Sequence, residues 1–400
     1  MDDIIIVGAG QAGGCAARAL RENGFGGRIR LFGEEPHPPY ERPPLSKDVL
    51  QGLAESSSSG LWTAEQQESL NLDCHFGDTV IRIDPERKEV ITGDGTAHAY
   101  DRLLLTTGSR VRRLAIPGAD CENVHYLRGI GDAEAIRKRL APGARLLVIG
   151  AGWIGLEVAA SARAMGAEVV IIDGGSYPCA RVLPEDLGHY FLRLHTANGV
   201  RLLMETTVER LEGAMAATKA VLSTGEVLPV TAVVIGIGVI PNDELAAAAG
   251  LGTANGIIVD EFGRTSDSSI FAAGDVARQP AENGGTVRHE TSANAQNHAI
   301  AVAKSMLDQD EPFRDIPSFW SDQYDASMQV VGSLTDYDDM ILRGSMDGDR
   351  FIQLYLRNNR ISGAAGLNSA QDISIAKRLM KQNKSITGQQ LRQAPTLRNL

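Results

Sequence analysis

The chain has 400 residues, of which 43% are apolar and 22% charged, and its formal net charge at pH 7 is −11. This length predicts two or three domains with ample core. The acidic balance argues against a general nucleic-acid binder. No apolar run approaches the roughly 18 residues of a transmembrane helix, so no membrane span is predicted. The start, Met1-Asp2-Asp3, lacks the basic region of a signal peptide, and we expect a cytoplasmic location.

Two glycine motifs each follow a short aliphatic run, residues 4–7 and 146–149, and precede a stretch with helical patterning. The motifs have the spacing GxGxxG, at Gly8, Gly10 and Gly13 and again at Gly150, Gly152 and Gly155. The first glycine permits a tight turn, the second lets the backbone approach a pyrophosphate, and the third lets helix and strand pack closely. The helix N-terminus then offers its free N–H groups to the phosphates. The repeat predicts two dinucleotide sites, unless one of the two units is a nonfunctional relic.

Each motif is followed, at the end of the next predicted strand, by an acidic residue that can accept hydrogen bonds from ribose hydroxyls. The first unit supplies Glu34 and Glu35, and the second supplies Asp173. Gly174, Gly175 and Ser176 follow Asp173 without an immediate cation, so a 2′-phosphate would be repelled. The second site is therefore predicted to favour NADH over NADPH, with Arg181 packing elsewhere.

Further along, two aliphatic strands end in glycines and are expected to close the two nucleotide units, residues 100–108 at Thr107-Gly108 and residues 231–242 at Gly236 and Gly238. A strand at 269–273 meets Gly274-Asp275. Such an Asp is either part of an ordinary turn or holds a ribityl hydroxyl.

From about residue 318 the chain alternates as strands and then turns helical at 373–382, which predicts a separate small α+β domain. Residues 371–400 carry one acid, Asp372, and six basic residues: Lys377, Arg378, Lys381, Lys384, Arg392 and Arg398. This stretch is either a solvated basic face or a docking face for an acidic protein.

The cysteines and histidines predict neither a dithiol nor a metal centre. Cys15, Cys74, Cys121 and Cys179 form no CxxC pair, and a redox dithiol needs two sulfurs close enough to bridge. We interpret them as reduced thiols. The histidines show no HExxH spacing, so any metal chemistry would lie on a partner.

The motifs GAGQAG, GEEPHPPYERPPLSKDVL, TTGSR, GAGWIGLEVA, GIGVIPN, FAAGDVA and FWSDQ occur in an order that resembles the NAD-dependent flavoprotein ferredoxin reductases. These are the putidaredoxin reductase-like proteins and the reductase components of ring-hydroxylating dioxygenases, the phenylpropionate and biphenyl systems in particular. The resemblance covers essentially the whole chain. It implies an α/β protein with two Rossmann-like domains of the glutathione reductase-like fold and a small α+β domain. The implied domains are FAD-binding (1–112 and 243–317), NAD-binding (113–242) and C-terminal interface (318–400).

The resemblance also assigns residues, position by position. For FAD it implies Gly8, Gly10, Gly13, Glu34, Glu35, Arg42, Lys47, Val80, Thr107, Gly108, Arg128, Gly274, Asp275, Ser292 and Trp320. For NAD it implies Gly150, Gly152, Trp153, Ile154, Gly155, Asp173 and Gly238. Two positions depart from the family pattern: Ser292 stands where a Trp is usual and His298 where a Gln is usual, both near the expected flavin edge.

The implied activity is hydride transfer from NADH to FAD, followed by single-electron transfer to an acidic [2Fe–2S] ferredoxin that docks near the flavin edge and the C-terminal domain. That ferredoxin would feed a ring-hydroxylating dioxygenase or a haem monooxygenase. The protein positions the two rings and tunes them. Lys47 is predicted to stabilise negative charge on the flavin, with Glu157 as its counter-ion. A monomer or weak homodimer is expected.

Three alternative functions are possible on the same fold. The first is a rubredoxin reductase, which would pass its electrons to rubredoxin instead of a ferredoxin. An NADH oxidase, peroxidase or disulfide reductase would place a Cys near the flavin, where this chain reads RPPLSKD. A redox-dependent interaction protein like the apoptosis-inducing factors shares PPLSK and both glycine motifs, but would carry a C-terminal insertion or a targeting segment.

Overall fold

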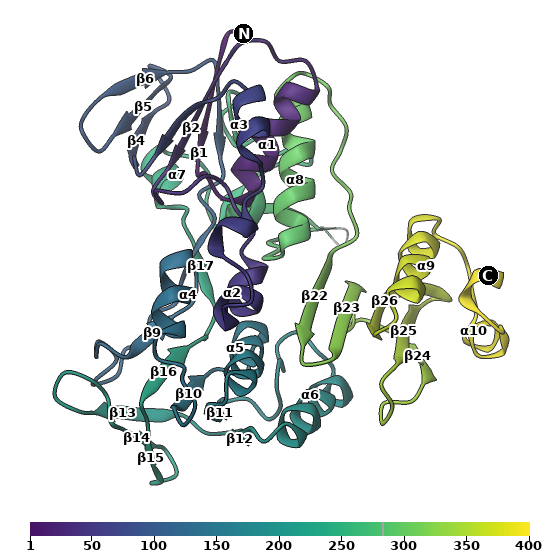
Figure 1. Cartoon of the computed structure of the whole chain (residues 1–400). Coiled ribbons are helices and arrows are strands. Elements are labelled where there is room, and N and C mark those ends of the chain that lie inside the picture. Colours follow the sequence, from purple (N-terminus) through teal and green to yellow (C-terminus); the bar gives the residue numbers. More distant parts are fainter. Residues whose placement is uncertain (282–283) are drawn as a thin grey trace. The chain divides into compact units, whose positions relative to one another are not determined.

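The computed structural model describes residues 1–281 and 284–400 (Figure 1). The chain forms two compact units, each assembled from three segments. Unit 1 comprises Met1–Arg42, Ser56–Arg110 and Val239–Asp315, and unit 2 comprises Pro43–Glu55, Val111–Gly238 and Ile316–Leu400. In the described part of the chain, no helix is both long and apolar enough to cross a membrane.

Unit 1 is built on a parallel sheet in the order β19 (Ile270–Ala272), β7 (Arg102–Leu105), β1 (Asp3–Val7), β2 (Arg28–Gly33) and β3 (Asp73–Phe76). Its inner strands β1 and β7 contain continuous aliphatic runs, residues 4–7 and 103–105, because both faces of the sheet are covered. On one face α1 (Gln11–Glu22) and α8 (Ser292–Ser305) lie side by side (Figure 1). Ala16, Leu20 and Val302 are buried there.

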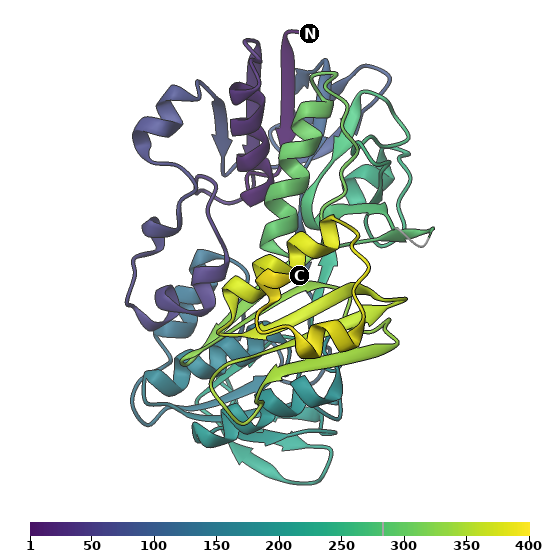
Figure 2. The same ribbon diagram turned by 90° about the vertical axis from the view of Figure 1, so that its right-hand side faces the viewer.

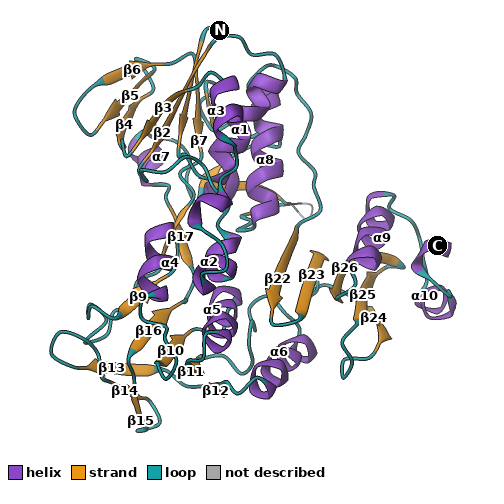
Figure 3. Cartoon of the chain, viewed as in Figure 1, coloured by secondary structure: helices purple, strands orange, loops and turns teal. Residues whose placement is uncertain are grey.

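The other face of this sheet is covered by smaller elements, as Figure 3 shows for β4 to β6. They are the antiparallel sheet β4 (Val80–Asp84), β5 (Glu89–Thr92) and β6 (Ala97–Ala99), the sheet β18 (Ile257–Ile258), β20 (Ala277–Pro280) and β21 (Thr286–Val287), and α7 (Glu244–Ala248). Unit 1 also contains α3 (Ala64–Ser69) and the 3₁₀ turns η2 (Ser56–Ser59) and η3 (Gly274–Val276). A short strand β8 (Ser109–Val111) pairs with β17 (Val239–Pro241).

Unit 2 repeats the parallel arrangement, in the order β12 (Arg201–Leu203), β11 (Glu168–Ile172), β10 (Arg145–Ile149), β16 (Ala232–Ile235) and β9 (Val124–Tyr126). Its helical elements are η1 (Pro43–Ser46), α2 (Asp48–Gln51), α4 (Ile130–Arg137), α5 (Trp153–Ala164) and α6 (Glu185–Ala197). An antiparallel sheet of β13 (Val208–Glu212), β14 (Lys219–Leu222) and β15 (Val227–Pro229) shares a second core with the parallel sheet.

The C-terminal part of unit 2 is an antiparallel sheet in the order β22 (Ser318–Gln323), β23 (Ala326–Gly332), β26 (Arg360–Leu367), β25 (Phe351–Arg357) and β24 (Asp339–Gly344). It is followed by α9 (Ala370–Lys381), α10 (Gly388–Gln393) and η4 (Leu397–Asn399). Helix α9 lies on this sheet (Figure 2) and buries Ile373, Ala376 and Leu379. Gly366 permits the approach, because a Cβ there would lie 2.8 Å from Ile373.

The predicted fold class is confirmed: two units with parallel nucleotide-type sheets and an α+β C-terminal part. The compact units nevertheless group the C-terminal sheet and residues 43–55 with the second parallel sheet. One continuous apolar core explains this grouping, since it contains Leu50, Leu156, Met328 and Phe351 together. The division into three domains stays a prediction.

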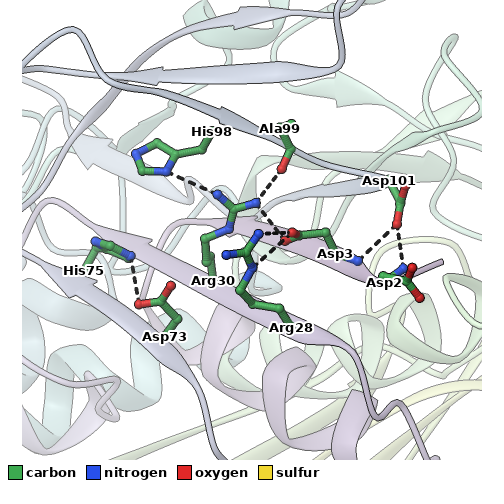
Figure 4. A network of polar contacts seen from close by, with 9 residues as sticks. All are labelled: Asp2, Asp3, Arg28, Arg30, Asp73, His75, His98, Ala99 and Asp101. Atoms are coloured by element: carbon green, nitrogen blue, oxygen red, sulfur yellow. Dashed lines mark hydrogen bonds and ion pairs between the residues drawn. The ribbon is translucent and has the colours of Figure 1, made fainter.

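At the amino ends of β1 and β2, Asp3 binds two arginines (Figure 4). Buried Arg30 donates to Asp3 Oδ1 at 2.7 Å and to the Ala99 carbonyl, and lies 3.2 Å from His98 Nδ1. Exposed Arg28 donates to Asp3 Oδ2 at 2.5 Å. This cluster ties β1, β2 and β6 together at the end of the sheet opposite the first glycine motif.

The two arginines of this cluster should differ sharply in their contribution to stability. We expect Arg30→Met to lower the free energy of unfolding by about 2 kcal/mol, because it removes the buried guanidinium that bonds the half-buried Asp3 carboxylate and the Ala99 carbonyl. Arg28→Met should cost much less, because Arg28 is exposed and water replaces its ion pair with Asp3. Urea denaturation of both variants measures the difference, and equal losses would contradict this interpretation.

Candidate functional site

The glycine motif of unit 1 forms a tight backbone cradle between β1 and α1. Gly8 has φ +113°, and a Cβ there would lie 2.2 Å from the Thr106 carbonyl oxygen. A Cβ on Gly13 would lie 2.0 Å from the Gly8 carbonyl oxygen. Both positions therefore require glycine for close packing. Gly10 differs, because a Cβ there would meet no atom of residues 1–281 and 284–400 within 4 Å. This open space at the start of α1 fits a pyrophosphate.

The second motif repeats this geometry in unit 2. Gly150 has φ +107°, and a Cβ there would lie 2.3 Å from the Gly236 carbonyl oxygen. A Cβ on Gly155 would lie 2.0 Å from the Gly150 carbonyl oxygen, whereas one on Gly152 would meet nothing within 4 Å among the residues that the structure describes. Both cradles thus fit a dinucleotide, with packing contacts at the first and third glycines and open space at the second.

The two acids after β2 have different surroundings. Glu34 is exposed. Glu35 accepts hydrogen bonds from the Tyr40 hydroxyl at 2.5 Å and from Arg42 Nη2 at 2.6 Å. Burial raises the pKa of Glu35, but the Arg42 charge and these hydrogen bonds outweigh it, so its pKa lies below the ordinary value. We therefore propose Glu34 as the ribose acceptor, while Glu35 fixes Arg42.

Asp173 binds the second glycine loop itself. Its Oδ2 accepts a hydrogen bond from the Ala151 backbone N–H and its Oδ1 accepts one from the Gly175 N–H, both at 2.7 Å. Each carboxylate oxygen can accept a further hydrogen bond, so this arrangement leaves capacity for ribose hydroxyls. The loop contact was not predicted from the sequence.

Other residues assigned to FAD gather around the carboxyl ends of the unit 1 strands. Thr107 Oγ1 donates to the Asn242 carbonyl at 2.7 Å, and the Gly108 carbonyl accepts from the Asn242 N–H at 3.0 Å. Asp275, in η3 next to Gly274, accepts a hydrogen bond from Ser109 at 3.1 Å. Val80 is buried at the start of β4. Their contacts with FAD stay proposals.

The two departures from the family pattern lie on α8. Ser292, its first residue, exchanges hydrogen bonds with the Gln11 side chain at 2.8 and 3.0 Å, so it joins the first turns of α1 and α8. His298 is almost fully buried, 3.0 Å from Gln279 Nε2, with its ring centroid 4.9 Å from that of Phe313. His298 is thus a core residue of unit 1.

Buried histidines make stability depend on pH. Burial lowers the pKa of His298 to about 3 and that of His195 to about 4, against 6.5 for an ordinary histidine. Between pH 6.5 and 4 the unfolded chain binds more protons, so stability falls as the pH falls. Each histidine contributes up to about 1.4 kcal/mol per pH unit. We expect His298→Gln to flatten this slope in urea denaturations at pH 4.5 to 7, and an unchanged slope would contradict it.

The predicted ion pair between Lys47 and Glu157 is present within unit 2. Lys47 Nζ lies 2.9 Å from Glu157 Oε2, and Glu157 on α5 is only 4% exposed. Ser46 Oγ donates to the same Oε2 at 2.5 Å, and Ser321 Oγ donates to Oε1 at 2.6 Å. Three donors therefore hold this buried carboxylate. Its catalytic role stays a prediction.

Sequence reasoning missed Ser46 and Ser321, although each lies next to a residue that it singled out, Lys47 and Trp320. Period-two alternation in β22 could have indicated Ser321, because Trp320 is 41% exposed and Ser321 is fully buried. Ser161, one turn after Glu157 on α5, donates to the Ser46 carbonyl at 2.7 Å. Helix α5 thus fixes the Lys47 segment at two points.

The remaining assigned residues of unit 2 have varied environments. The Trp153 ring packs against Phe191 and Phe319, so we propose only its backbone N–H for the nucleotide. Ile154 is 44% exposed at the start of α5. The Arg181 guanidinium lies 3.5 Å from where a Cβ on Gly238 would be, so it adjoins an assigned NAD position rather than packing elsewhere.

Arg128 lies just before α4, where its backbone N–H donates to Asp132 Oδ2 at 2.9 Å. Its assignment to FAD, like that of Trp320, stays a proposal.

Known proteins resemble this chain over nearly its whole length. The family model for pyridine nucleotide-disulphide oxidoreductases matches residues 2–299, and a reductase C-terminal model matches residues 318–400. The chain belongs to the pyridine nucleotide-disulphide oxidoreductase family. Rhodocoxin reductase of Rhodococcus erythropolis is 40% identical, over 97% of this chain and 91% of that protein. The ferredoxin–NAD(+) reductase component of the p-cumate 2,3-dioxygenase system of Pseudomonas putida is 39% identical, over 97% and 95%.

Among solved structures, the covalent putidaredoxin reductase–putidaredoxin complex matches with a TM-score of 0.94 and 36% identity, over 98% of this chain and 95% of that one. The predicted resemblance to ferredoxin reductases is thereby confirmed. The family name includes disulphides, yet all four cysteines, each in the described part of the chain, are free thiols. Burial raises the pKa of Cys15 and of Cys74 to about 11, which disfavours the reactive thiolate.

Proposed function

We propose that this chain is a ferredoxin–NAD(+) reductase that takes electrons from NADH through FAD and delivers them to a [2Fe–2S] ferredoxin of an oxygenase system. The observation that carries the proposal is the pair of glycine cradles, each open at its second glycine and each followed by an acid. FAD belongs to the cradle of unit 1 and NAD(H) to that of unit 2. Bound FAD supplies the conversion of a hydride into single electrons.

The chain's own residues bind and orient the two cofactors. The backbone at Gly10 and Gly152 approaches the pyrophosphates, and the first turns of α1 and α5 supply N–H donors. Glu34 and Asp173 accept hydrogen bonds from the riboses. The Lys47 ammonium, paired with Glu157, is the cation proposed to stabilise negative charge on the flavin.

The acceptor is an external one-electron carrier, because the free cysteines offer no dithiol relay. The relatives that match over the full length are named as reductases of rhodocoxin and of dioxygenase systems, and the structural match is a complex with putidaredoxin. These names support a ferredoxin partner and, beyond it, a dioxygenase, while a haem monooxygenase stays a prediction of the family resemblance. The cytoplasmic location stays a prediction.

Steady-state assays with NADH test this function. We expect rapid reduction of a [2Fe–2S] ferredoxin, much slower reduction of rubredoxin, and a preference for NADH over NADPH because Asp173 would repel a 2′-phosphate. Ferricyanide serves as the control acceptor, since it needs no protein docking. Ferricyanide reduction without any ferredoxin reduction would contradict the proposed partner.

The basic stretch 371–400 offers a docking face of limited extent. Arg392 is paired with Asp339 at 2.8 Å, Lys384 donates to the Leu400 carbonyl, and Lys377 donates to Ser318 at 3.5 Å. Arg378 on α9 and Arg398 in η4 are exposed and line one shallow depression. We therefore propose these two arginines as contacts for the acidic ferredoxin.

Reversing both charges in Arg378→Glu/Arg398→Glu should raise the KM for ferredoxin about tenfold or more at low ionic strength, because long-range attraction accelerates docking. The effect should shrink as salt is added. Ferricyanide reduction should not change. A ferredoxin KM equal to that of the unaltered protein would show that Arg378 and Arg398 do not contact the ferredoxin.

A further inference from the structure

A chain of buried hydrogen bonds reaches the Lys47–Glu157 ion pair from the C-terminal sheet, entirely within unit 2. Ser321 Oγ donates to Glu157 Oε1 at 2.6 Å, and Gln323 Nε2 donates to Ser321 Oγ at 2.9 Å. His195 Nε2, on α6, lies 2.8 Å from Gln323 Oε1. The Tyr324 hydroxyl lies 3.1 Å from His195 Nδ1.

In each hydrogen bond from Glu157 to Tyr324, only one of the two groups can be the donor. An ionised carboxylate only accepts, so Ser321 must give its proton to Glu157 and accept from Gln323. The Gln323 amide oxygen then faces His195, which must carry its proton on Nε2 and accept at Nδ1 from Tyr324. Burial lowers the pKa of His195 to about 4, so its ring is neutral at pH 7, and burial raises the pKa of Tyr324, so its hydroxyl keeps its proton.

The central side chains of this hydrogen-bond series are inaccessible to water. Ser321, Gln323 and His195 are at most 1% exposed, so solvent cannot replace a lost donor. Glu157 Oε1 is therefore committed to Ser321, and Oε2 is left for Lys47 and Ser46. The orientation of the carboxylate plane, and with it the place of the ammonium, follows from residues that do not touch Lys47.

We propose that Ser321, Gln323 and His195 are positioning residues that orient Glu157 and thereby fix the Lys47 ammonium for the proposed reaction. This inference deepens the proposed function and rests on it, since it concerns the cation assigned to the flavin. It also gives the C-terminal strand β22, which carries Ser321 and Gln323, a role in positioning Lys47. The residues act through Glu157 and are not catalytic themselves.

Acylation of the Lys47 amine tests the proposal without turnover. FAD-loaded protein is pulsed with acetic anhydride at pH 7, and mass spectrometry compares Lys47 with exposed Lys219 as the internal reference. A hydrogen bond to a charged group contributes enough to shift an equilibrium about tenfold or more. We expect Ser321→Ala to raise Lys47 acylation about tenfold at equal FAD content, and Ser321→Thr to restore slow acylation.

Ser369→Ala is the matched control. Ser369 is equally buried in unit 2 and donates to the Leu367 carbonyl at 2.9 Å, without a link to Glu157. This variant should acylate Lys47 at the unaltered rate. If Ser321→Ala folds and also acylates at that rate, the hydrogen bonds merely join strand to helix and the proposal is wrong. No NADH or ferredoxin is present, so this failure would leave the reductase assignment standing.

The donor and acceptor roles along this series of hydrogen bonds can also be tested on the unaltered protein. This test remains available if the Ser321→Ala variant does not fold. Long-range ¹⁵N–¹H spectra of histidine-labelled protein at pH 7 report which ring nitrogen carries the proton. We expect His195 to be neutral and protonated on Nε2. A proton on Nδ1 would reverse the chain at Gln323, remove the donor from Ser321, and overturn the proposal.

Discussion

Glu157→Leu is expected to lower the free energy of unfolding by about 3 kcal/mol, because it leaves the half-buried Lys47 ammonium and two buried hydroxyls without their acceptor. The carboxylate accepts from Lys47, Ser46 and Ser321, and leucine offers none of them a partner. Urea denaturation of the FAD-loaded protein measures the loss. Glu168→Gln, at an exposed position on β11, is the control and should change stability by less than about 0.5 kcal/mol.

A double-mutant cycle separates the ion pair from the rest of this effect. Removing both charges in Lys47→Met/Glu157→Leu should cost less than the sum of the single variants, since neither charge is then left unpaired. Strictly additive losses would show that Lys47 and Glu157 do not depend on each other. That result would contradict the ion pair on which both the proposed function and the further inference rest.

Gly152→Val should weaken NADH binding by about 10- to 150-fold while leaving the protein folded. A Cβ at Gly152 meets no atom of the described residues within 4 Å, and the backbone there, at φ −78° and ψ 177°, suits valine. The valine would obstruct the pyrophosphate, whose charge-assisted hydrogen bonds to backbone N–H groups are worth about 1.5–3 kcal/mol. Equilibrium titration with NADH measures the Kd.

The same substitution in the first cradle provides the control for the second. Gly10→Val should reduce FAD retention, which is measured as bound flavin per protein, and should not act through the NADH site. Gly155→Val, by contrast, should impair folding, because a Cβ there would lie 2.0 Å from the Gly150 carbonyl oxygen. Normal NADH binding by a well-folded Gly152→Val protein would contradict the assignment of the second cradle.

The cradles were predictable because their geometry demands particular residues at fixed spacing. The first and third glycines of each motif lie too close to a backbone carbonyl for any side chain to fit: Gly8, Gly13, Gly150 and Gly155. The glycine spacing therefore predicts the geometry directly. The aliphatic runs of β1 and β10 likewise predict buried parallel strands. Lys47 and Glu157 were paired through the family resemblance, and the contact is present.

The rest of the site depends on tertiary contacts that no local pattern encodes. Ser46 and Ser321 meet Glu157 across separations of 111 and 164 residues, and a single serine carries no periodic signal. In the sequence, His195 is simply one residue of a predicted amphipathic helix. Its role depends on its contacts with Gln323 and Tyr324, which are distant in the sequence. The grouping of the C-terminal sheet with the second parallel sheet likewise follows from one shared apolar core.

In the proposed function, NADH reduces a bound flavin, and the flavin's electrons then pass to a ferredoxin. The most direct measurement is an anaerobic titration of the purified protein with NADH and then NADPH, followed by oxidised [2Fe–2S] ferredoxin, while the visible absorbance is recorded. We predict a flavin spectrum that is bleached by stoichiometric NADH, responds much more slowly to NADPH, and returns as the ferredoxin is reduced. A colourless protein that takes up no FAD, or a flavin that NADH does not bleach, would contradict the account.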